Sequence, residues 1–75
     1  MEEKVIEIIS KISKISVTKL RDNMDTVKLW DSISHVEIIL TIESEFDVSF
    51  DEDDIAKMTT PNKVLNCLSG KVDTK

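Results

Sequence analysis

The apolar residues of this chain recur at the spacing of an α-helix, and this periodicity constrains its fold more than any other feature. Near the N-terminus, the i, i+3, i+4, i+7 pattern of one helix face is filled by Val5, Ile8, Ile9 and Ile12. The pattern predicts a first helix from 3 to 13, with Ile6 off the main apolar stripe. Gly and Pro occur once each, so low-complexity linkers are absent.

A second helix is predicted from 32 to 46, after a connection from 16 to 30 that is long for so small a domain. The connection is compatible with a short helical turn near 18–21. The face of the second helix that should meet the core carries Ile38, Ile39, Ile42 and Phe46. Val36 and Leu40 lie on a neighbouring strip beside Glu37. Their periodicity is equally compatible with core packing and with exposure.

Ser32 lies at the predicted start of this second helix. Asp31 and Ser32 each have a side-chain oxygen that can cap the first turn, and 34–37 also reads as a capping box. Each of these caps leaves the Ser32 hydroxyl at or near the positive end of the helix dipole. An attached phosphate would be favoured there.

Two shorter helical segments follow. Asp51 can cap the first of them, with Asp54 at the reciprocal N3 position. Thr60 can cap the second, and Pro61 suits its first position because that residue needs no N–H partner. Gly70 is expected to end this last helix.

These elements predict an all-α fold, a small four-helix bundle with a long first loop and a short third helix. We expect one domain over 1–75, with 71–75 as a frayed tail. A single cysteine, Cys67, excludes an internal disulfide and fits a reducing compartment, so we expect a cytoplasmic protein. No stretch is long enough to span a membrane, and we see no signal-peptide h-region.

The net charge of −5 is concentrated in one part of the chain, because no Lys or Arg occurs from 29 to 56. The acids in that window are Asp31, Glu37, Glu43, Glu45, Asp47, Asp51, Glu52, Asp53 and Asp54. Such a face argues against nucleic acid and favours partners with basic patches. The acids could also serve solubility alone, but their position beside Ser32 favours a binding role.

Asp31-Ser32-Ile33, followed by an acidic amphipathic helix, resembles the Asp-Ser-Leu signature of acyl carrier proteins. In that family the serine is esterified with 4′-phosphopantetheine. The resemblance continues through Glu-Phe-Asp at 45–47 and the acidic short helix that ends in Met-Thr-Thr at 58–60. It is close from 30 to 60 and loose before that. Two departures are Ile in place of the usual Leu, and Trp30 near the place of a usual Gly.

The resemblance implies a carrier, not an enzyme. Ser32 would bear the arm, and its acyl thioesters would serve fatty acid or specialised, polyketide-like biosynthesis. Expected partners are a phosphopantetheinyl transferase and acyl-loading and acyl-processing enzymes with basic patches, and the carrier is expected to be a monomer that spans no membrane. The residues expected to meet partners are Asp31, Val36, Glu37, Leu40 and Glu43. The residues expected to line an acyl pocket are His35, Ile39, Ile42, Phe50, Ile55, Met58 and Cys67.

The sequence is also compatible with other interpretations. A peptidyl or aminoacyl carrier is the alternative within the class, and an unmodified acidic helical adaptor is the alternative outside it. A calcium loop beginning at Asp47 lacks its turn glycine and its final glutamate, so no metal site is expected. A hydrolytic triad of Asp31, Ser32 and His35 has no glycine-shaped turn to form an oxyanion hole. Trp30 is interpreted as a packing anchor for the long loop.

Overall fold

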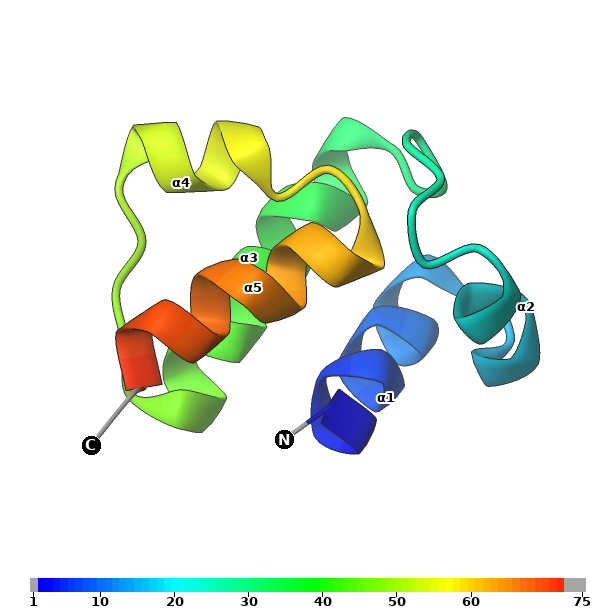
Figure 1. The fold of residues 1–75 in the computed structure, drawn as a ribbon, viewed down its shortest axis with the longest axis horizontal. Helices are drawn as coiled ribbons and strands as arrows, with labels where there is room; N and C mark the ends of the chain where they lie inside the picture. The colour runs from blue at the N-terminus through cyan, green and yellow to red at the C-terminus, as the bar shows by residue number, and fades with distance from the viewer. Residues whose placement is uncertain (1, 73–75) are drawn as a thin grey trace.

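The computed structural model describes residues 2–72 and folds them into five α-helices (Figure 1). In chain order these are α1 (Glu2–Ser13), α2 (Val17–Asp22), α3 (Ser32–Phe46), α4 (Glu52–Lys57) and α5 (Pro61–Val72). The all-α prediction is confirmed. The four predicted helices correspond to α1, α3, α4 and α5, with α4 as the short one. The additional helix, α2, occupies the first part of the long connection and is longer than the turn expected there.

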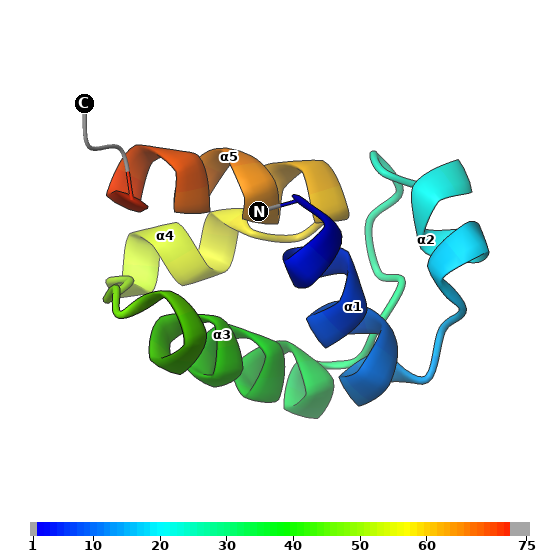
Figure 2. The same ribbon diagram turned by 90° about the horizontal axis from the view of Figure 1, so that it is seen from below.

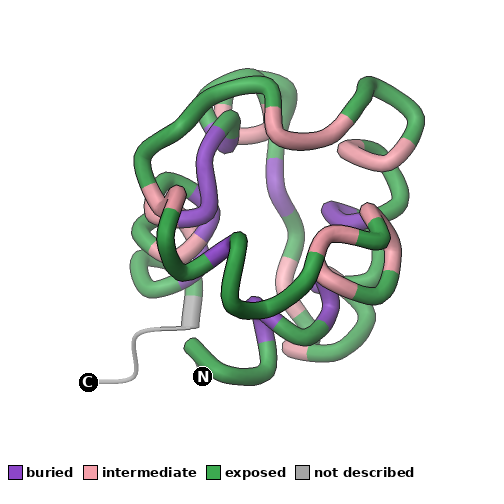
Figure 3. Tube along the Cα trace, turned by 90° about the vertical axis from the view of Figure 1, so that its right-hand side faces the viewer, coloured by how far each residue is buried: buried purple, intermediate pink, exposed green. Residues whose placement is uncertain are grey.

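The helices surround one apolar core. Helix α1 packs against α2, α3 and α5, and α4 packs against α5. Figure 2 shows α3, α4 and α5 together on one side of α1, with α2 on its other side. The core consists of Val5, Ile6, Ile8, Ile9, Leu20, Ile38, Ile39, Ile42, Phe50, Met58, Val64 and Leu68. Figure 3 colours the trace by burial, and the buried positions are not confined to the helices. Phe50 and Met58 of the core lie in the links before and after α4, so these links help to close the core.

The apolar face of α1 is wider than its periodicity indicated. Ile6, which lies off the main stripe, is fully buried, whereas Ile12 on the stripe is only half-buried. Because α1 has neighbours on opposite sides, it needs a broader apolar surface than a helix that packs on one partner. Leu20 of α2 is also fully buried, so α2 closes one side of the core.

The two predicted caps after α3 are confirmed. Asp51 and Asp54 form a reciprocal capping box at the start of α4. Thr60 Oγ1 accepts the backbone N–H of Lys63 at 3.1 Å, and Pro61 is the first residue of α5. The first cap fixes the start of α4, and the second fixes the end of the link between α4 and α5, which passes close to the start of α3.

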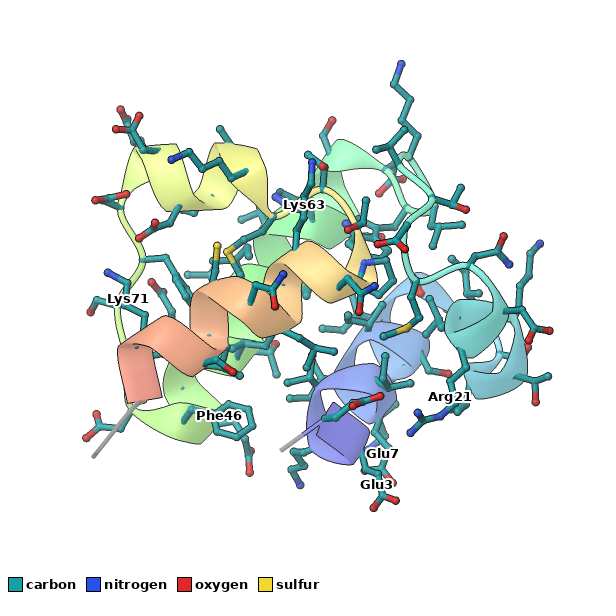
Figure 4. All side chains as sticks on the ribbon, in the orientation of Figure 1. Glu3, Glu7, Arg21, Phe46, Lys63 and Lys71 are labelled. Atoms are coloured by element: carbon teal, nitrogen blue, oxygen red, sulfur yellow. The ribbon has the colours of Figure 1, made fainter. Side chains whose placement is uncertain are left out.

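The prediction that Gly70 ends α5 is wrong, because the helix continues to Val72 and Gly70 has no positive φ. The extra residues bring Lys71 to α4, where its Nζ lies 3.1 Å from Asp54 Oδ2. Figure 4 shows Lys71 at the C-terminal end of α5. Of the predicted frayed tail 71–75, the first two residues are therefore part of α5, and 73–75 lie outside the described part of the chain.

The connection from α2 to α3 is held against α5. The backbone N–H of Asn62 donates to the Met24 carbonyl at 2.9 Å, and the Asn62 side chain donates to Asp25 Oδ1 at 2.8 Å. Lys28 then adopts a left-handed backbone conformation, with φ of 62°. Because the loop is pinned at one end and turns at the other, it reaches the start of α3 in a defined path. Within residues 2–72, no helix is both long and apolar enough to cross a membrane.

Candidate functional site

Asp31 caps α3 and thereby places Ser32 as the first residue of the helix. The Oδ1 atom of Asp31 accepts the backbone N–H of Ser34 at 2.8 Å. Of the caps that the sequence left open, this one is formed. Ser32 itself is exposed. Its hydroxyl thus lies in the first turn of a 15-residue helix, at the positive end of the dipole.

The cap also fixes the charge beside Ser32. The hydrogen bond from the Ser34 backbone, and secondarily one from the Ser34 side chain, hold the pKa of Asp31 below its usual value. Asp31 is therefore a carboxylate throughout the neutral range. The negative charge beside Ser32 therefore lies on a side chain that the cap holds in place.

Ser32 opens onto a surface groove of about 540 Å³. Three segments form it, namely the end of the α2–α3 connection, the first two turns of α3, and the link between α4 and α5. The residues that line it are Val27, Lys28, Trp30, Asp31, Ser32, His35, Val36 and Thr59. Apolar side chains from two segments therefore face a space that the Ser32 hydroxyl also reaches.

His35 uses both of its ring nitrogens to contact two other parts of the chain, the end of the α2–α3 connection and α4. Trp30 Nε1–H donates to His35 Nδ1 at 3.0 Å, and His35 Nε2 lies 2.9 Å from the Ile55 carbonyl oxygen. Because Nδ1 accepts and a carbonyl cannot donate, the bonds assign the proton to Nε2. The two rings are also stacked, with centroids 6.3 Å apart and planes 13° from parallel. His35 therefore ties the loop before Ser32 to α4.

This bridge was not predicted from the sequence, where His35 was placed only at the mouth of an acyl pocket. The sequence does contain a weak signal, which is a Trp five residues before a His at a helix start. The bridge also removes His35 from any role as a base for Ser32, because both nitrogens are already used. Trp30 is half-buried against the core, as expected for a packing anchor.

The predicted partner strip on α3 is largely at the surface. Val36 and Leu40 are 52% and 58% exposed, which resolves the alternative that their periodicity left open. Ile33 is 75% exposed and extends the apolar strip toward Ser32, although sequence reasoning did not select it. Glu37 is exposed beside them. An apolar strip flanked by acids thus runs along α3 from the Ser32 end.

Glu43 has a different setting from the other acids of α3. It is half-buried, and its Oε2 atom accepts the backbone N–H of Phe50 at 2.7 Å. The left-handed Asp47, with φ of 55°, ends α3 just before this contact. Glu43 therefore stabilises the turn from α3 to α4, and its charge is only partly available to a partner.

The predicted acyl-pocket residues divide into a buried and a half-buried set. Ile39, Ile42, Phe50 and Met58 belong to the core, whereas His35, Ile55 and Cys67 are half-buried. The groove beside Ser32 shares only His35 with this set. The hydrogen bond from His35 to the Ile55 carbonyl joins α3 to α4.

Two other titratable groups near α4 have shifted pKa values. The hydrogen bond from Lys71 is the main reason that the pKa of Asp54 lies below its usual value. Burial, aided by the negative charge of Asp54, raises the pKa of the Cys67 thiol. In the part of the chain that the structure describes, no three His, Cys, Asp or Glu side chains converge as metal ligands would.

Comparison with known proteins agrees with this geometry. Residues 3–68 match a family model described as "Phosphopantetheine attachment site". The chain is 36% identical over 74 residues to a protein named "Acyl carrier protein" from Buchnera aphidicola subsp. Schizaphis graminum (strain Sg). That match covers 95% of this chain and 92% of the relative.

Proposed function

The chain belongs to the acyl carrier protein family, and on that premise we propose that Ser32 bears its 4′-phosphopantetheine arm. Members of the family are carriers and not enzymes. When bound, the arm supplies a thiol that holds acyl groups as thioesters. The observation that carries the assignment is the exposed Ser32 hydroxyl in the first turn of α3, where the helix dipole favours an attached phosphate.

Loading of Ser32 requires a phosphopantetheinyl transferase and coenzyme A. The Ser32 Oγ atom forms a bond to the pantetheine-bearing phosphorus, the bond from that phosphorus to the bridging oxygen breaks, and adenosine 3′,5′-bisphosphate leaves with that oxygen. The hydroxyl proton leaves to a base of the transferase, because His35 is occupied by Trp30 and Ile55. The chain itself supplies an accessible hydroxyl on a rigid helix end.

The test is labelling by coenzyme A with a promiscuous transferase. Wild-type protein should gain one label, and Ser32→Ala should gain none. Ser34→Ala is the matched control, because it removes a nearby hydroxyl but keeps the backbone N–H that Asp31 caps. Labelling that persists in Ser32→Ala would refute the assignment.

We further propose that partner enzymes dock on the exposed strip of α3. Val36 and Leu40 provide apolar contact, and Asp31 and Glu37 provide charges that attract basic patches. Glu43 contributes through the same face, although its carboxylate also holds the Phe50 backbone. A small docking strip of this kind supports fast association and rapid release, which suits a carrier that visits several enzymes.

Longer acyl chains are proposed to enter the core between α3 and α4. Their walls would be Ile39, Ile42, Phe50, Ile55, Met58 and Cys67, with His35 at the mouth. A flexible Met and a small Cys allow the packing to open when a chain arrives. Each buried methylene would contribute ~0.8 kcal/mol before the cost of opening the core is subtracted. Entry on this route requires the His35–Ile55 hydrogen bond to break.

The melting temperature across a series of acyl lengths tests this pocket. Protein loaded with a medium chain should melt above unloaded holo protein, and Cys67→Phe should reduce the difference by filling the end of the pocket. Equal melting temperatures for all lengths would indicate cargo that stays in solvent. Such a result would favour small or polar cargo, including that of a peptidyl or aminoacyl carrier.

The biosynthetic setting is proposed more broadly, as fatty acid or specialised, polyketide-like synthesis by a monomeric, cytoplasmic carrier of one domain. Trp30 supports a specialised pathway, because it stands near a place where general fatty acid carriers usually have Gly. Transfer assays with the two kinds of acyl-loading enzyme distinguish these settings.

A further inference from the structure

The groove beside Ser32 is distinct from the pocket proposed for long acyl chains. Its volume of about 540 Å³ falls within the range of about 300–1,000 Å³ that is typical of small-molecule sites. The core residues of the acyl pocket do not line it, and its walls come instead from the α2–α3 connection, the first two turns of α3 and Thr59 in the link between α4 and α5. The groove therefore offers a second place for a ligand attached at Ser32.

The walls of the groove are held in place before any ligand arrives. Trp30 is fixed by its hydrogen bond to His35 and by the stack of the two rings. The connection that carries Val27 and Lys28 is pinned to α5 through Asn62. A wall that is already ordered loses little conformational entropy when a ligand binds, which favours occupation even by weak contacts.

The chemistry of the walls matches the phosphate of a phosphopantetheine arm and the apolar pantoate part next to it. Val27 and Val36 are each 52% exposed, so both offer apolar surface that the fold itself does not cover. Lys28 is the cation among the lining residues, and no Lys or Arg occurs between Lys28 and Lys57. The Asp31 carboxylate is engaged with the Ser34 backbone. An ester at Ser32 would place its phosphate in this groove, within the field of Lys28.

We propose that the groove is the resting site of the arm carried by Ser32. The apolar pantoate part of the arm lies against Val27, Trp30 and Val36, and Lys28 faces its phosphodiester. The inference rests on the proposed function of Ser32. Because Ser32 itself lines the groove, tethering keeps the arm at high effective concentration there, and weak contacts suffice.

The position of Val36 couples this resting site to docking. Val36 lines the groove and also belongs to the exposed α3 strip that is proposed to meet partners. A partner that covers Val36 makes this part of the groove wall unavailable to the arm. Docking on the strip therefore frees the arm for the partner's active site, and undocking returns it to the groove.

The test is proton NMR of isotope-labelled holo protein whose arm is confirmed by intact mass. Cross-relaxation peaks should connect the geminal methyl groups of the arm with Val27, Val36 and the Trp30 indole. Val27→Ser should abolish the peaks to Trp30 and Val36. Val17→Ser is the matched control, because Val17 is also partly exposed, at 39%, but lies on α2 away from the groove.

A second pair of variants tests the charge. Lys28→Gln should change the phosphorus chemical shift of the arm, whereas Lys14→Gln should not. The two positions are matched, since Lys14 also has a left-handed backbone, with φ of 64°. If the arm is present on Ser32 but shows no peaks to the groove, the resting site is wrong and the proposed function stands. If Ser32 accepts no arm, both proposals fall.

Discussion

Replacement of His35 by Ala should destabilise the fold by about 2 kcal/mol. The substitution deletes two hydrogen bonds, from Trp30 Nε1 and to the Ile55 carbonyl, and a net contribution of about 1 kcal/mol each gives this figure. The stacked ring contact is lost as well, so this figure is a lower bound on the loss of stability. For a domain of this size, about 2 kcal/mol corresponds to a fall of roughly 8–16 °C in melting temperature.

Urea denaturation followed by circular dichroism measures this loss, with Ser34→Ala as the control on the same turn. A double-mutant cycle with Trp30→Phe separates the shared bond from the rest, because Phe keeps a ring but lacks the N–H donor. The double variant should lose less than the sum of the two single variants. A loss below about 0.5 kcal/mol for His35→Ala, which is typical of ordinary surface substitutions, would refute the bridge.

Three further outcomes are expected. Glu37→Lys should lower kcat/KM of the transferase and of acyl-loading enzymes at low salt, and its difference from wild type should shrink as added salt shortens the screening length below ~8 Å. Glu7→Lys on α1 should leave kcat/KM unchanged, and equal values for wild type and both variants at low salt would place docking elsewhere. Because the pKa of Asp54 is lowered in the folded state, its ion pair with Lys71 stabilises the fold at pH values above the unfolded pKa of 3.8, and this stabilisation is lost as the pH falls through the folded pKa. Lys71→Gln should raise the folded pKa of Asp54 in an NMR titration, and an unchanged titration would contradict the pairing. Because burial raises the pKa of Cys67, maleimide should alkylate it more slowly than the arm thiol at neutral pH, and equal rates by mass spectrometry would show that it is not shielded.

Local rules predicted the helix starts well. The capping box of Asp51 and Asp54 and the pairing of Thr60 with Pro61 are confirmed, because a cap involves side chains within three residues of the backbone they satisfy. For the start of α3, the sequence left three possible caps, namely Asp31, Ser32 and the capping box at 34–37. Choosing Asp31 among them required the path of the incoming loop, which no local pattern contains.

Features that depend on contacts between residues far apart in the sequence could not be predicted from local patterns. Glycine commonly ends a helix, yet α5 continues for two residues past Gly70, and one of them, Lys71, forms an ion pair with Asp54 of α4. The burial of Ile6 depends on neighbours on opposite sides of α1. The His35 bridge joins residues 20 positions apart, so its partner could not be read from the helix itself.

The central claim is that Ser32 carries a single arm, and peptide mapping of holo protein tests it most directly. Trypsin cleaves after Lys28 and Lys57, and no Lys or Arg lies between them, so Ser32 and Ser34 share peptide 29–57. One phosphopantetheine should be found on this peptide, and its fragment ions should place the added mass on Ser32. Added mass on Ser34 or on another peptide, or no added mass in the presence of an active transferase, would contradict the account.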